Sequence, residues 1–182
     1  MSEIAQGGQT ADDFIAWAMG RPEGERWELA HGEAVAMAAG CAAHGRAKLR
    51  IAERLSAAVR AAGLPCEVFV DGMAVQVDAT TVYEPDVLMR CGPPLPDDAV
   101  KLTDPVIVVE VVSPSSKARD SGAKLADYFC IDSLRHYLIV GTEDRTAIHH
   151  ARDADGQILT RIVHDGTVDF GTGLVLDGLF PA

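Results

Sequence analysis

The spacing of apolar residues along the chain changes several times, and each change marks an expected element. Apolar side chains recur at helical spacing from about residue 44 to 62, which predicts an amphipathic helix. The segment 105–112 is aliphatic at both odd and even positions, which predicts a central strand buried on both faces. A further buried strand is expected at 136–140. Together these segments form the expected core.

Capping and turn signals divide the rest of the sequence into shorter elements. Thr10 and Asp13 resemble a capping box that begins a short helix. Extended runs on either side of a glycine predict three hairpins, which turn at 31–32, 71–72 and 155–156. Another strand is expected around 87–89, and short strands follow the last hairpin.

A third helix is expected after the central strand. Ser115 or Ser116 can cap it, and it reaches about Ile131. The resulting order is helix, hairpin, helix, several strands, helix, strand and hairpin. This order predicts an α/β or α+β fold, with helices on the faces of a mixed sheet and hairpins near both ends. The length of 182 residues predicts one domain over residues 1–182.

Charge restricts the partners that the protein can have. Aspartate and glutamate number 27 against 16 lysines and arginines, a net charge of −11. This balance argues against coating nucleic acid by bulk electrostatics, although a local basic groove stays possible. Arg46, Arg50, Arg54 and Arg60 give the second helix a basic side, which either follows backbone phosphates or is simply a solvated face.

Cysteine usage and the start of the chain both suggest a cytoplasmic protein. The four cysteines are scattered and form no C-x-x-C pair, so reduced thiols are expected. No secretory signal is apparent at the beginning of the sequence, and no apolar run reaches the roughly 18 residues of a membrane helix. We therefore expect no membrane association.

Glu110 is the main candidate for chemistry, since it lies within the most apolar strand of the chain. A strand pitch places it on the same face as Val108 and Val112. An unpaired ionised carboxylate in a dry interior is too costly, so Glu110 must be paired, protonated or bound to a cation. The alternative is that the strand is nearly over and Glu110 simply reaches solvent.

Asp86 is the second candidate carboxylate. It follows Pro85 at the start of an apolar strand, which places it at a mouth of the sheet, although a solvated turn aspartate fits the same position. Two carboxylates at strand ends suit Mg²⁺, which takes one or two carboxylates and keeps several waters. The backbone carbonyl of Val111 can add a ligand.

Lys124 is the candidate cation, on the helix that follows the Glu110 strand. Asp120, Lys124 and Tyr128 stand four residues apart and line one side of that helix. An ordinary surface salt bridge between Asp120 and Lys124 explains the spacing equally well.

Three further residues near the predicted hairpin and second helix are weaker candidates. His44 begins the second helix on its apolar side and is either catalytic or a structural hydrogen-bonding residue. Glu28 and Glu33 flank the first hairpin and either reach a metal site or face water.

Several segments together resemble a known family. The segments are YEPDV, DPVIVVEVVSPSS, ARDSGAKLADYF and RHYLIV, preceded by WELAHGEAVAMAAGCAAHGRA. This combination, spanning roughly residues 14 to 140, resembles the Uma-two-type family of restriction endonucleases, within the PD-(D/E)xK nuclease superfamily. The resemblance implies a restriction-endonuclease-like core, a mixed sheet of about four strands between helices.

The resemblance also assigns roles to residues of this chain. Asp86 matches the aspartate of the P-D element, and Glu110 matches the acid of the (D/E)-x-K element. Val112 stands where the superfamily has its lysine, and Lys124 on the following helix matches the shifted lysine of the family. The implied activity is hydrolysis of DNA phosphodiester bonds, with Mg²⁺, or Mn²⁺ in its place, held by Asp86, Glu110 and the Val111 carbonyl.

Supporting roles and alternatives complete the hypothesis. Tyr128 and His44 are expected to contact phosphate or the metal-binding residues, and Lys124 to orient the attacking water. The alternatives are a nuclease-like binding or assembly module that does not cut, and a hydrolase of a small acidic phosphoester. Exposed apolar terminal strands favour a homodimer.

Overall fold

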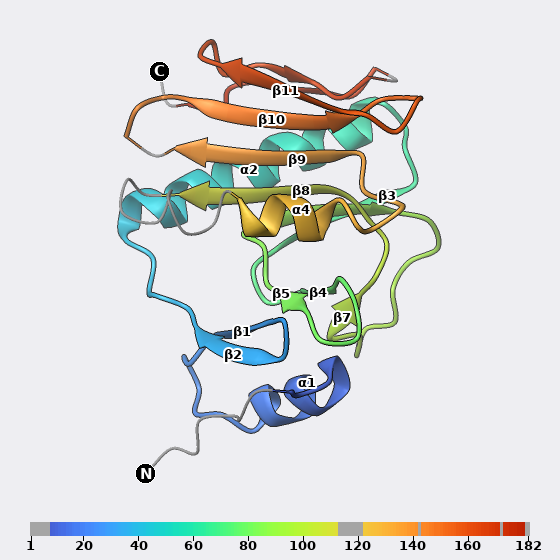
Figure 1. The fold of residues 1–182 in the computed structure, drawn as a ribbon. Helices are drawn as coiled ribbons and strands as arrows, with labels where there is room; N and C mark the ends of the chain where they lie inside the picture. Colours follow the sequence, from blue (N-terminus) through green and yellow to red (C-terminus); the bar gives the residue numbers. More distant parts are fainter. Residues whose placement is uncertain (1–7, 113–121, 142, 172, 181–182) are drawn as a thin grey trace.

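The computed structural model describes residues 8–112, 122–141, 143–171 and 173–180 (Figure 1). Its elements, in chain order, are α1 (Ala11–Met19), β1 (Trp27–Ala30), β2 (Glu33–Ala36), α2 (Ala42–Ala61), β3 (Cys66–Val70), β4 (Ala74–Gln76), β5 (Val82–Tyr83), β6 (Val87–Cys91), β7 (Lys101–Leu102), β8 (Pro105–Val112), α4 (Ala123–Tyr128), β9 (His136–Gly141), β10 (Ala147–Arg152), β11 (Ile158–Val163), β12 (Val168–Asp169) and β13 (Val175–Leu176). Mixed sheets flanked by a few helices confirm the predicted fold class.

The large sheet has the strand order β11-β10-β9-β8-β6-β3. β8 and β9 run parallel, and the other neighbours in this sheet are antiparallel. The aliphatic run of β8 lies in the interior of the sheet with most of its side chains buried, as its sequence predicts. Six strands make this sheet wider than the four that the family resemblance implies.

The two faces of the large sheet are covered by different elements. On one face, Ile51 and Leu55 of α2 pack against alternate side chains of β6, β8 and β9, together with the C-terminal β12–β13 hairpin. On the other face, Tyr128 of α4 packs beside Val108 and Val112 of β8. Figure 1 shows α2 behind the sheet and α4 in front of it. Glu110 shares the parity of Val108 and Val112, so its side chain belongs to the α4 face.

A smaller sheet, with the order β2-β1-β5-β4-β7, lies below the large one in Figure 1 and carries α1. Its first hairpin confirms the predicted turn at 31–32, where His31 and Gly32 have φ values of 50° and 84°. Thr10 caps α1 as predicted, because its Oγ1 accepts a hydrogen bond from the backbone N–H of Asp13, and its hydroxyl donates to the Asp13 carboxylate. Phe14 of α1 is buried against this sheet.

The hairpin predicted at 71–72 is wrong. Asp71 and Gly72 do have positive φ values of 52° and 72°, as a tight turn requires. However, β3 pairs with β6 in the large sheet, while β4 pairs with β5 and β7 in the small one. Instead of closing a two-strand ladder, this turn carries the chain from one sheet to the other.

The cysteines differ from the prediction. Cys66 and Cys91 occupy opposed positions on β3 and β6 and form a disulfide, whereas reduced thiols were expected at all four cysteines. The register explains the pairing, because Cys66 is the direct partner of Cys91 in the ladder. Cys41 and Cys130 are free, as expected, and both are exposed.

The third helix also differs from its prediction at the C-terminal end. α4 ends at Tyr128, and a turn in which the N–H of Ile131 donates to the carbonyl of Tyr128 follows it. The predicted caps Ser115 and Ser116, and the predicted partner Asp120, lie outside the described residues. The last predicted hairpin is confirmed by the pairing of β10 with β11 around 153–157.

A histidine pair links the large sheet to its C-terminal cover. The distance between His136 Nδ1 and His149 Nε2 is 3.1 Å, and both rings pack against Phe170. Burial lowers the pKa of each imidazole from 6.5 to about 4. The folded state therefore resists protonation that the unfolded chain accepts.

We expect acid to destabilise the protein through this pair. The stabilising contribution is complete above pH 6.5 and is lost as the pH falls toward 4, because the unfolded chain then binds more protons. Between pH 7 and pH 5 the melting temperature of wild type should fall by several degrees relative to that of a His149→Gln variant. Equal slopes for the two proteins would contradict the assignment.

In the described part of the chain, no helix has the length and apolar character needed to cross a membrane.

Candidate active site

The two candidate carboxylates meet because of the strand register. β6 and β8 are antiparallel, and Val87 pairs with Val109. Asp86 comes directly before Val87 and Glu110 directly after Val109, so the two acids lie at the same end of this strand pair. Both residues are buried, with relative exposures of 6% and 7%. The sequence 83–87 therefore places one acid where the chain leaves the small sheet and enters the large one.

Asp86 is surrounded by hydrogen-bond donors. His44 Nε2 lies 3.0 Å from Asp86 Oδ1, and the backbone N–H of Val111 donates to Oδ2 at 2.7 Å. Lys48 Nζ lies 3.4 Å from Oδ1. Burial alone raises the pKa of Asp86, but the His44 hydrogen bond, the Val111 N–H and the charges of His44 and Lys48 lower it overall. Asp86 is therefore an ionised carboxylate.

Glu110 has the opposite electrostatic character. Its Oε1 accepts hydrogen bonds from Lys124 Nζ at 3.1 Å and from the Tyr128 hydroxyl at 3.0 Å. Burial raises the pKa of Glu110 to about 8, and the nearby carboxylates of Glu28 and Asp86 add to this rise, while Lys124 opposes it. Additional positive charge beside Glu110 would relieve this repulsion.

Tyr128 holds Glu110 from the α4 side. Burial, and the neighbouring acid, raise the pKa of Tyr128 well above its ordinary value, so its hydroxyl keeps its proton and remains a donor. The ring packs against Tyr83 and Tyr137, with centroid distances of 5.4 and 5.1 Å. This packing fixes the direction in which the hydroxyl points.

Lys124 joins the acids of the two sheets. Its Nζ donates to Glu28 Oε1 at 2.8 Å as well as to Glu110, and it lies 5.0 Å from the centroid of the Tyr83 ring. Glu28 Oε1 in turn accepts a hydrogen bond from the backbone N–H of Glu84 at 3.0 Å. The ammonium thus reaches the Glu110 strand from a helix.

The structure separates the predicted supporting residues. The bonded residues described above form one cluster, which includes Asp86, Glu110 and Lys124. His44, Tyr128 and Glu28 also belong to this cluster. Glu33 is exposed on β2 and is not among the described residues that bond to the cluster. Val111 contributes its N–H to Asp86, and the role predicted for its carbonyl stays a prediction.

Lys48 and Asp71 were not predicted. Lys48 Nζ donates to Asp71 Oδ1 at 2.8 Å, and its side chain is buried beside Asp86. The signal in the sequence was available, since Lys48 stands one helical turn after His44 on the side that carries Ile51. A lysine within the apolar side of a helix calls for a buried acidic partner.

The donor set suits a hard divalent cation. Asp86, just before β6, and Glu110, on β8, offer carboxylate oxygens. Mg²⁺ needs only one or two such ligands because it keeps several waters. Within the described ranges, no group of three histidines, cysteines or acids is arranged to hold a metal ion. A cation would therefore be bound through the two carboxylates, backbone oxygen and water, in competition with the protein donors named above.

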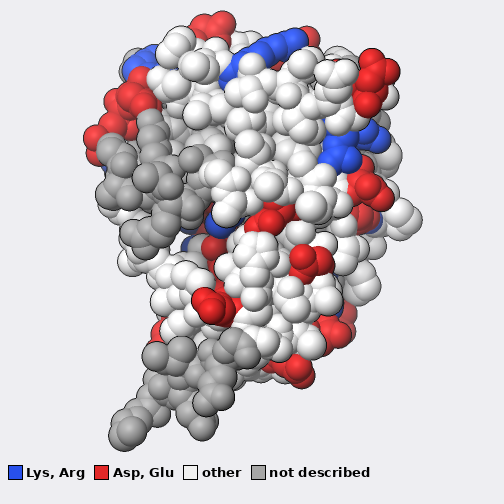
Figure 2. Space-filling view, in the orientation of Figure 1, with Lys and Arg blue, Asp and Glu red and all other residues white. Residues whose placement is uncertain are grey.

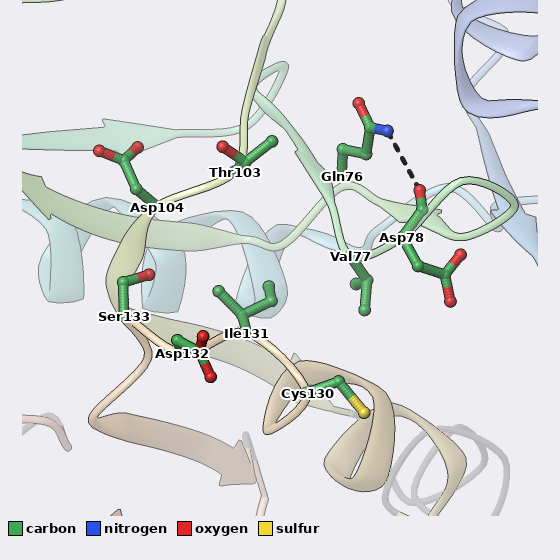
Figure 3. A pocket seen from close by; sticks show the side chains of 9 residues that line it. All are labelled: Gln76, Val77, Asp78, Thr103, Asp104, Cys130, Ile131, Asp132 and Ser133. Atoms are coloured by element: carbon green, nitrogen blue, oxygen red, sulfur yellow. Dashed lines mark hydrogen bonds between the residues drawn. The ribbon is translucent and has the colours of Figure 1, made fainter.

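The surface is hollowed between the two sheets. In Figure 2, basic and acidic atoms meet in a hollow between the upper part of the molecule, built on the large sheet, and the lower part. A separate cavity of about 380 Å³ is lined in part by Asp78, Asp104 and Asp132 (Figure 3). Asp104 is paired with Arg90 there, and none of the residues of the cluster lines this cavity.

Comparisons with known proteins identify the family and the fold. A family model described as Uma2, "Putative restriction endonuclease", matches residues 11–179. The chain is similar to the uncharacterized protein slr1290 of Synechocystis, with 29% identity over 150 residues, 81% of this chain and 76% of that protein. A second Synechocystis protein, sll1609, is 25% identical over 76% of this chain and 80% of its own length.

A solved structure shares the fold. It is described as a "putative nuclease belonging to DUF820" from Anabaena variabilis and superposes with a TM-score of 0.67. The match covers 92% of both chains at 14% sequence identity, which establishes similarity of fold.

Proposed function

The chain belongs to the Uma2 family, and from this premise we propose that it is a divalent-metal-dependent endonuclease that hydrolyses DNA phosphodiester bonds at Asp86, Glu110 and Lys124. The observation that carries the proposal is the contact between Lys124 Nζ and Glu110 Oε1 at 3.1 Å. It supports a lysine on α4 in the role that the superfamily gives to a residue on the strand itself.

Different residues of the site have different roles in the proposed hydrolysis. Asp86 and Glu110, with the Val111 carbonyl, would hold Mg²⁺ or Mn²⁺, which supplies Lewis acidity toward the phosphate and lowers the pKa of bound water. The Lys124 ammonium orients the attacking water and offsets the negative charge that develops on the phosphate oxygens. Attack at phosphorus breaks one P–O ester bond and leaves a phosphate and a hydroxyl end.

The supporting residues position the two acids. The Tyr128 hydroxyl fixes the direction of Glu110, and His44 with the Val111 N–H fixes Asp86. Metal binding to Glu110 competes with its proton, because burial and neighbouring acids raise the pKa of this carboxyl to about 8. Activity at limiting metal should consequently increase with pH up to about 8.

DNA must approach an acidic protein, so local cations matter. Arg46 is exposed in the first turns of α2, on the same helix as His44 and Lys48, and Arg54 is exposed two turns further on. We propose that these arginines contact backbone phosphates of the bound DNA. Such contacts fix position without reading sequence, so specificity requires a further surface or a partner.

One observation favours the second candidate, a module that binds without cutting. In the described residues, Asp86 accepts from His44 and Val111 at both carboxylate oxygens, and Glu110 Oε1 accepts from Lys124 and Tyr128. Three of the four carboxylate oxygens of Asp86 and Glu110 thus already have protein donors. Metal dependence separates the two candidates.

Supercoiled plasmid should be nicked by the purified protein in Mg²⁺ or Mn²⁺ and left intact in EDTA. The expected reason is that neither carboxylate activates water without a cation. Single-stranded RNA and bis(p-nitrophenyl) phosphate, tested in parallel, separate DNA cleavage from the hydrolysis of other phosphoesters. Intact plasmid under all metal conditions would favour the binding module, and cleavage of the small ester alone would remove DNA from the proposal.

A further inference from the structure

The outer edge of the large sheet is formed by β11, and its side chains are open to solvent. Five of its six residues are exposed, including Ile158, Leu159 and Ile162 at 38%, 46% and 64%. In the described part of the chain, β11 pairs with β10 alone. Figure 1 shows it at the top of the sheet, on the far side from β1 and β2. An aliphatic edge strand of this kind invites pairing with another strand.

The hydrogen-bond pattern of the β10–β11 hairpin determines which backbone groups of β11 point outward. The N–H of Asp153 donates to the carbonyl of Gln157, so this pair is hydrogen-bonded. Hydrogen-bonded and open pairs alternate along an antiparallel ladder. Leu159, Arg161 and Val163 therefore bond to β10, and the backbone groups of Ile158, Thr160 and Ile162 face outward.

The outward-facing residues are self-complementary. If Thr160 lies on a two-fold axis opposite Thr160 of a second copy, Ile158 pairs with Ile162 of that copy and the reverse pair forms as well. Apolar cross-strand pairs and Thr–Thr pairs are both favourable neighbours. The Thr160 hydroxyl is already bonded to His150 Nδ1 at 2.8 Å, so pairing would leave that contact intact and use only the free backbone edge.

Charge distinguishes this register from one of its two nearest competitors. A shift of the partner by two residues would place Arg161 on the axis, opposite Arg161 of the other copy, in an open pair with close side chains. Like charges directly opposite each other are destabilising. The Thr160 register instead sets Arg161 beside Leu159 of the other copy, where the aliphatic part of the arginine can cover the leucine.

From these features we propose that the protein forms a symmetric dimer in which β11 pairs antiparallel with β11 of a second copy, centred on Thr160. The two large sheets then form one continuous sheet. This proposal does not depend on the proposed nuclease activity. It commits the partner to a second copy of this chain, because the β11 strand of that copy supplies the isoleucine and threonine partners in this register.

Sedimentation equilibrium should find a dimer for wild type and a monomer for Ile162→Lys, which places a charge against Ile158 of the partner. The matched control is Val35→Lys, since Val35 is an exposed aliphatic residue on the edge strand of the small sheet, and this variant should remain dimeric. Circular dichroism checks that each variant is folded. A monomeric wild type, or a dimer unaffected by Ile162→Lys, would overturn the proposal.

Disulfide trapping tests the register. In a Cys41→Ser, Cys130→Ser background, Thr160→Cys should give a covalent dimer on mild oxidation, because hydrogen-bonded partners have Cα atoms about 5.5 Å apart. Arg161→Cys should not, because its own counterpart would then lie beyond the roughly 7 Å that a disulfide can span. The reverse result, with only Arg161→Cys linked, would refute the Thr160 register.

Discussion

Glu110→Gln is expected to reduce metal-dependent plasmid nicking by about a thousandfold, because one of two anionic ligands is replaced by a neutral amide. A thousandfold loss corresponds to about 4 kcal/mol of transition-state stabilisation. The matched control is Glu33→Gln, which changes an exposed glutamate of β2 and should nick as wild type does. Equal nicking by wild type and Glu110→Gln would point to a contaminating nuclease and remove Glu110 from the site.

Thermal stability in EDTA shows whether Glu110→Gln remains folded, and its pH dependence can be given a sign. The pKa of Glu110 is raised from 4.5 to about 8, so the folded protein holds a proton that the unfolded chain releases. The resulting stabilisation is complete below pH 4.5 and is lost as the pH rises through 8. The variant lacks this loss, so its stability relative to wild type should increase between pH 5 and pH 9.

Lys124→Met is expected to destabilise the protein by about 3–5 kcal/mol, because the carboxylates of Glu28 and Glu110 lose their common buried cation. For a chain of this size the melting temperature should fall by roughly 10 °C. Nicking should be lost as well, since no ammonium remains beside the attacking water. Differential scanning calorimetry and the plasmid assay measure the two effects.

A second lysine provides the control for Lys124→Met. Lys101 is paired with Asp12, which is largely exposed, so Lys101→Met should cost at most about 1 kcal/mol. Mg²⁺ or Mn²⁺ should also raise the melting temperature of Lys124→Met more than that of wild type, because the unpaired acids would then bind the cation. Similar losses for Lys124→Met and Lys101→Met would contradict a buried role for Lys124.

The sequence predicts the core of this fold well, because its strongest signals are local. The aliphatic run of β8 and the helical spacing of α2 each specify an element without reference to the rest of the chain. The turn at 71–72 shows where local signals fail. Asp71 and Gly72 have the backbone of a hairpin turn, yet the choice of strand partner depends on β6, which lies further along the sequence.

The candidate site was only partly predictable for the same reason. Glu110 is recognisable as an acid within an apolar strand, but its neighbours come from distant parts of the sequence: α4, β1 and the turn before β6. The contact between Lys124 and Glu28 joins positions 96 residues apart, and no spacing rule anticipates it. Lys48 could have been found, because its place on the apolar side of α2 is a local anomaly.

The β1–β2 hairpin affects how the chain can be divided. Glu28 lies in the small sheet, yet it shares the ammonium of Lys124 with Glu110 of the large sheet. The first forty residues are therefore not an interchangeable module, despite forming their own hairpin and helix. A chimera that takes this segment from a relative must preserve an acid at position 28, and N-terminal truncation past the hairpin would leave Lys124 with one carboxylate fewer to balance its charge.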